Sequence, residues 1–101
     1  MDEKIDKLLR TIFQSLGTLD TSLGKDNDAN TLMMINIIEE AFKSIPDPCC
    51  DEANTNDLVQ GAKLSFAAVS ENKANLDRES AKQHVGECIS KLATALNPAL
   101  Q

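Results

Sequence analysis

The stretch that decides the fold reads DEKIDKLLRTIFQSLGTLDTSL and covers residues 2–23. Its apolar residues recur every three or four positions: Ile5, Leu9, Ile12, Leu16, Leu19 and Leu23. This spacing places them along one stripe of an α-helix and is typical of helices that pack at shallow angles. The pair Glu3 and Lys7, four residues apart, adds to helix stability, and Gly24 is a suitable stop. We therefore predict a helix over residues 2–23.

Three further segments carry apolar residues at helical spacing. They cover residues 31–45, 56–72 and 77–97. The predicted stripes are Met34, Ile38, Ala41 and Ile45 in the first segment, Val59, Ala62, Phe66 and Val69 in the second, and Ala81, Val85, Cys88, Leu92 and Ala95 in the third. Pro46 ends the first of these helices. Thr55 or Asn56 can cap the next one, and Asp77 can cap the last.

The segment between residues 72 and 77 contains no Gly or Pro, so one continuous helix has to be considered. Extending the stripe that ends at Val69 would require apolar residues at positions 73, 76, 80 and 83. The chain has Lys73, Leu76, Ser80 and Gln83 there. The stripe of the last segment is offset by about one position, which predicts a break near residues 73–76.

The four segments together predict an all-α fold. No β-branched residues alternate over four positions, so nothing in the chain indicates a strand. Four amphipathic helices with short connections favour an antiparallel up-down four-helix bundle in a single helical domain over residues 1–101. The alternative is a set of helical hairpins that is completed by dimerisation.

Composition and charge narrow the classes of function. The chain has 101 residues and a net charge of −6, which disfavours nucleic acid as a partner. The first ten residues are charged and amphipathic, unlike a secretory signal. The apolar run Leu32–Ile38 is too short to span a membrane. The odd count of three cysteines, together with the absent signal, favours a reducing, cytoplasmic location.

The soft metal ligands of the chain are Cys49, Cys50, His84 and Cys88, which add up to the set of a Cys₃His zinc site. Adjacent cysteines are unusual zinc ligands, and Cys88 falls on an apolar stripe where a small buried residue is expected. Proline and aspartate around the cysteine pair already specify a turn. We therefore assign no metal and no cofactor, and keep the four residues as weak zinc candidates.

Two other patterns suggest binding or transfer roles. His84 is the only histidine of a small helical chain, which is compatible with a phosphotransfer domain, although Gly86 and Lys91 stand at the wrong spacing for one. The acidic loop around the cysteines contains Asp47, Asp51, Glu52 and Asp57, with no basic residue between them. Such a loop is compatible with a nucleic-acid mimic that binds a basic protein cleft.

The segment 31–45 is apolar around most of its circumference. Met33 and Ile37, with Met34 of the stripe beside them, extend its apolar surface, so this helix either lies at the centre of the bundle or faces another protein. Flexible methionine side chains suit adaptable binding surfaces. We therefore predict a protein-binding module without catalytic activity, of the adaptor, regulator, small-chaperone or immunity and inhibitor type. We expect a homodimer through this helix, and no membrane or nucleic-acid partner.

Overall fold

The computed structural model describes residues 2–25 and 28–97, and four α-helices account for most of this part of the chain. They are α1 (Glu3–Leu23), α2 (Asp28–Lys43), α3 (Ala53–Glu71) and α4 (Arg78–Leu96), with a short 3₁₀ turn, η1 (Lys73–Asn75), between the last two. These described residues contain no strand, so the predicted all-α class is confirmed. None of the described helices has the length and apolar content that crossing a membrane requires.

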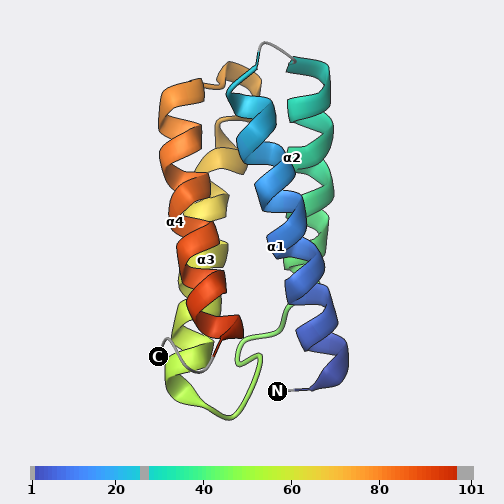
Figure 1. Ribbon diagram of the computed structural model, residues 1–101, viewed down its shortest axis with the longest axis vertical. Helices are drawn as coiled ribbons and strands as arrows, with labels where there is room; N and C mark the ends of the chain where they lie inside the picture. Colours follow the sequence, from blue (N-terminus) through green and yellow to red (C-terminus); the bar gives the residue numbers. More distant parts are fainter. Residues whose placement is uncertain (1, 26–27, 98–101) are drawn as a thin grey trace.

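The four helices run alternately up and down along the long axis of the molecule (Figure 1). Each helix packs against two neighbours, and the ring order is α1, α2, α3, α4 and back to α1. The start of α1, the end of α4 and the loop between α2 and α3 all lie at the same end of the bundle. This arrangement confirms the predicted antiparallel up-down four-helix bundle.

The core forms where the apolar stripes of the helices meet. On α1 the buried apolar residues are Leu9, Ile12, Leu16, Leu19 and Leu23, with Ile5 half-buried beside them. On α3 and α4 every residue of the predicted stripes is buried: Val59, Ala62, Phe66, Val69, Ala81, Val85, Cys88, Leu92 and Ala95. These three predicted stripes are confirmed. Burying one large aliphatic side chain contributes about 1.5–3 kcal/mol, so the stripes supply the main stabilising energy of the bundle.

The stripe predicted for the second helix is confirmed at Ile38 and Ile45 and wrong at Met34 and Ala41. The buried residues there are Thr31, Ile35, Ile38, Phe42 and Ile45, whereas the predicted Met34 and Ala41 are only half-buried. Thr31 fits into the core because its hydroxyl hydrogen-bonds to that of Ser22 on α1, at 2.7 Å. Phe42 packs against Phe66 of α3, with ring centroids 5.5 Å apart. The apolar pattern alone does not identify the core face of α2, because that face includes the polar residue Thr31.

The bounds of the second helix also differ from the prediction. α2 begins at Asp28 rather than at residue 31, and it ends at Lys43 rather than at residue 45. The backbone N–H groups of Ser44 and Ile45 bond to carbonyls three residues back, so the chain tightens as it leaves the helix. Ile45 therefore stays buried although it lies beyond the helix end.

The predicted cap of the third helix is wrong. Glu52 is the N-cap, and α3 begins at Ala53 rather than at residue 56. The Glu52 carboxylate accepts hydrogen bonds from the backbone N–H groups of Asn54 and Thr55 and from the Thr55 hydroxyl. A glutamate side chain is long enough to reach back over the first turn, so Thr55 is buried inside the helix instead of preceding it.

The break between the third and fourth helices lies where the change of apolar phase predicts it. α4 starts immediately after Asp77, the predicted cap, whose carboxylate accepts hydrogen bonds from the backbone N–H groups of Glu79 and Ser80. The next residue, Arg78, ties this start to the end of α1. Its Nη1 donates to three backbone carbonyls there, those of Ser22, Leu23 and Lys25, over 2.7–3.3 Å. A helix end leaves such carbonyls without intrahelical partners, so Arg78 satisfies them from α4.

Candidate functional site

The side of α2 that faces away from the bundle carries exposed apolar side chains. Met33 is 55% exposed, and Ile37, one turn further along, is 51% exposed. Met34 is half-buried and packs against the core, and Leu32 is exposed beside Met33. We refer to Met33, Met34 and Ile37 as the α2 outer surface. Two of these three residues, which the sequence predicts as an interface, therefore lie where a second molecule can reach them.

The α2 outer surface lies within an uncharged part of the chain. From Ala29 to Ile38 there is no Asp, Glu, Lys or Arg, although 26% of all residues are charged. Charged residues resume at Glu39, whose carboxylate turns towards α3 and bonds to Ser70 and Lys73. These two hydrogen bonds, that of Ser70 first, lower the pKa of Glu39. Glu40 and Lys43, which follow Ile37 on α2, are exposed and form an ion pair at 3.2 Å, so charged side chains border the α2 outer surface at this end.

The loop between α2 and α3 has a shape that side chains of α3 hold in place. Lys63 Nζ donates to the carbonyl of Ile45 at 2.9 Å, and Gln60 Nε2 donates to the carbonyl of Pro46 at 2.9 Å. Asn56 Oδ1 accepts a hydrogen bond from the backbone N–H of Cys49, further along the loop, at 2.9 Å. Asn56, Gln60 and Lys63 lie on one face of α3 because they are four and three residues apart. The loop is thus fastened at three successive points.

The two adjacent cysteines lie at the end of this fastened segment. The sulfur atoms of Cys49 and Cys50 are 3.7 Å apart, and Cys50 Sγ lies 3.5 Å from the carbonyl oxygen of Glu52. Cys49 is buried, and this burial, together with its contact with Cys50, raises the pKa of its thiol to about 11. Cys50 is half-buried. Both cysteines border a surface hollow of about 580 Å³, which is also lined by Asp2, Pro48, Asp51 and Glu52.

The other two zinc candidates lie away from this pair. Cys88 is buried in the stripe of α4, its Sγ lies 3.1 Å from the carbonyl oxygen of Ala62, and burial raises its pKa to about 12. His84 belongs to the second turn of α4, whereas the cysteine loop lies at the end of the bundle where α4 finishes (Figure 1). Within residues 2–25 and 28–97, no group of three or more His, Cys, Asp and Glu side chains is placed to hold a metal ion. The structure does not bring the four candidates together.

All four acidic residues of the loop are exposed, but two of their carboxylates bond to the protein's own chain. Glu52 caps α3, and its hydrogen bonds, that from the Thr55 hydroxyl first, lower the pKa of its carboxyl. Asp47 Oδ1 accepts a hydrogen bond from Asn56 Nδ2 at 3.3 Å. Asp51 and Asp57 are exposed. Two of the four predicted acidic-loop residues therefore bind the protein's own chain, which weakens the resemblance to a phosphate backbone.

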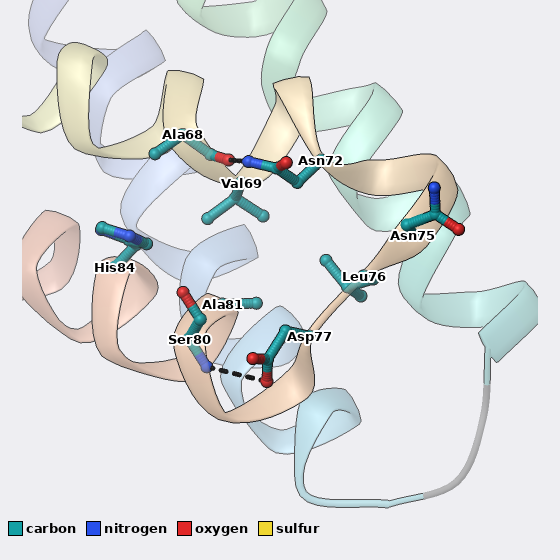
Figure 2. A pocket seen from close by; sticks show the side chains of 9 residues that line it. All are labelled: Ala68, Val69, Asn72, Asn75, Leu76, Asp77, Ser80, Ala81 and His84. Atoms are coloured by element: carbon teal, nitrogen blue, oxygen red, sulfur yellow. Dashed lines mark hydrogen bonds between the residues drawn. The ribbon is translucent and has the colours of Figure 1, made fainter.

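His84 borders a polar cavity between the end of α3, η1 and the start of α4, as Figure 2 shows. The cavity has a volume of about 210 Å³ and is lined by Ala68, Val69, Asn72, Asn75, Leu76, Asp77, Ser80, Ala81 and His84. The His84 side chain is 36% exposed, and Glu87 Oε2 lies 4.0 Å from its Nδ1. The Nδ1 atom of His84 is buried and has no hydrogen-bond partner among the described residues. Phosphotransfer through His84 stays a prediction from the sequence.

An apolar groove between α2 and α3 was not predicted from the sequence. Its volume is about 260 Å³, and its lining residues are Glu39, Phe42, Lys43, Lys63, Phe66, Ala67, Ser70 and Glu71. The groove is formed by residues of two helices, and the apolar stripe of one helix does not predict how it packs against the other. The only available signal is the pair of phenylalanines, one on each of the two neighbouring helices.

Compared with models of protein families, with curated proteins and with solved structures, the chain finds no match. The structure itself defines a four-helix bundle with an uncharged apolar surface on the outside of α2. The function proposed below therefore rests on the four-helix bundle and on the α2 outer surface.

Proposed function

We propose that this protein is a protein-binding module that associates with a second copy of itself through the α2 outer surface. It acts as an adaptor, regulator, small chaperone or inhibitor and has no catalytic activity. The observation that carries the proposal is the exposure of Met33 and Ile37 one turn apart on one helix. Full burial of an apolar side chain of this size contributes about 1.5–3 kcal/mol, and about half of each side chain is still exposed, so covering both residues on each copy supplies about half of that amount per residue.

The lack of charge in this part of α2 is compatible with a second copy as the occupant of the surface. Each chain carries a net charge of −6, so two copies repel one another over most of their surfaces. The stretch Ala29–Ile38 has no charged residue, so two α2 helices meet there with the least repulsion. In a two-fold arrangement with antiparallel α2 helices, Met33 of each copy packs against Ile37 of the other.

The salt dependence of association distinguishes a second copy from a basic partner. Added salt screens the repulsion between two acidic chains, so the homodimer becomes tighter as ionic strength rises. A complex with a basic protein is held by attraction between opposite charges and becomes weaker under the same change.

Size-exclusion chromatography with light scattering tests the proposal. The double variant Met33→Lys/Ile37→Lys places four lysines in the proposed two-fold interface, and we expect dimerisation to weaken at least about 100-fold, or about 2.7 kcal/mol. The matched control is Leu64→Lys on α3, where Leu64 is 75% exposed. The control should remain dimeric, and circular dichroism should show that both variants are folded. A wild-type monomer, or a double variant as dimeric as the control, would contradict the proposal.

A further inference from the structure

Cys49 and Cys50 are placed as a chelating pair before any ligand is bound. Their sulfur atoms are 3.7 Å apart. Two sulfurs bound at 2.3 Å to one tetrahedral centre are about 3.8 Å apart, whereas a linear centre needs about 4.6 Å, twice that bond length. The observed separation therefore suits a ligand atom that holds two sulfurs at a bent angle, and it does not suit a linear two-coordinate ion.

The surroundings of the pair keep this geometry in place. Asn56 holds the backbone N–H of Cys49, and Gln60 bonds to both Asn56 and the carbonyl of Pro46. Because α3 fixes the loop in this way, binding costs little further ordering of the chain. The hollow of about 580 Å³ beside both cysteines gives a small ligand access to them.

The number of side chains that can act as ligands at this site decides which metal or metalloid it suits. Zinc requires four ligands, and the described residues offer no group of three or more His, Cys, Asp and Glu side chains that could hold a metal. Trivalent arsenic that carries one organic group needs only two sulfurs to complete a pyramidal, three-coordinate centre, in which the sulfur–arsenic–sulfur angle is far from linear. Two adjacent thiols without a third ligand therefore match an arsenical better than they match zinc.

We propose that Cys49 and Cys50 form a dithiol site that binds one trivalent arsenical. An arsenical R–As=O condenses with the two thiols to give R–As(S–Cys)₂ and one molecule of water. Two arsenic–sulfur bonds form, the arsenic–oxygen bond is lost, and both thiol protons leave with the oxygen as water. Arsenic stays trivalent, so no oxidant or reductant is needed. The product is neutral, which suits a loop that contains Asp47, Asp51 and Glu52.

Phenylarsine oxide added to the folded, full-length protein tests the site. A large excess of 2-mercaptoethanol is included because it removes arsenicals that are held by one thiol only. We expect intact-mass measurement under native conditions to show one phenylarsenic group per chain, with the loss of one water. Cys50→Ser should weaken retention at least about 100-fold, equivalent to about 2.7 kcal/mol. The matched control, Cys88→Ser, should retain the adduct.

The variants separate chelation from loss of fold. Cys50 is half-buried, so we expect Cys50→Ser to keep the far-ultraviolet circular dichroism of the wild type. Cys49 is buried, so Cys49→Ser can unfold the protein, and the test of chelation therefore uses Cys50→Ser. An adduct that wild-type protein loses to the monothiol would overturn the proposal. Equal retention by Cys50→Ser and wild type would overturn it, as would loss of the adduct in a Cys88→Ser protein whose circular dichroism matches that of the wild type. Zinc retained in place of the arsenical would also overturn it.

Discussion

At the scale of single residues, Glu52 decides where α3 begins. The sequence predicts a cap at Thr55 or Asn56, because Ser, Thr, Asp and Asn are the usual N-cap residues. Asp77 follows that rule, and its predicted role is confirmed. Glu52 does not follow it, so the start of α3 could not be predicted. Thr31 was missed for a related reason, because its partner Ser22 on another helix is what makes a buried hydroxyl acceptable.

The lowered pKa of Glu52 gives a testable dependence of stability on pH. A carboxyl whose pKa is lowered on folding stabilises the folded state above its ordinary pKa of 4.5, and this contribution is lost as the pH falls through the folded value. We expect the free energy of unfolding of the wild type, measured by urea titration, to decrease below pH 4.5. Glu52→Gln should show a smaller decrease. The exposed neighbour Asp51 provides the control, Asp51→Asn, and an equal pH dependence in all three proteins would argue against the role of Glu52.

At the scale of elements, the stripes of α1, α3 and α4 could be predicted from the spacing of their larger apolar residues, although α3 also carries the exposed Leu64 on another face. The stripe of α2 could not, because apolar residues surround that helix and only packing selects its core face. Helix ends were less predictable than helix centres, since the ends depend on long side chains from other elements. Arg78 illustrates this, because it completes the end of α1 from the start of α4.

Removing the Arg78 contacts should weaken the joint between α1 and α4. Hydrogen bonds from a charged donor contribute about 1.5–3 kcal/mol, and we expect Arg78→Ala to lower the free energy of unfolding by about that amount, measured by urea titration. The control is Lys82→Ala, which removes a single surface ion pair to Asp20 at 3.4 Å. Such a pair contributes about 0–1 kcal/mol. Equal losses in the two variants would show that the carbonyl contacts of Arg78 are not stabilising.

At the scale of the whole molecule, four stripes and short connections were enough to predict the up-down bundle. They were not enough to predict which helix faces remain exposed. The zinc candidates could be listed from residue types, but only the fold shows that they lie apart. The exposure of the proposed interface residues was partly predictable: Met33 and Ile37 are exposed, whereas Met34 packs against the core. Exposure depends on the exact rotation of α2, which a pattern with apolar residues on most sides leaves open.

We propose that this acidic bundle pairs with a second copy of itself through the α2 outer surface. A native mass spectrum of the wild-type protein, recorded at increasing ammonium acetate concentration, tests it most directly. We expect a species of twice the 11.0 kDa chain mass, and we expect its share to grow as the salt concentration rises. A spectrum that shows only the single-chain mass, or a dimer whose share falls with added salt, would contradict the account.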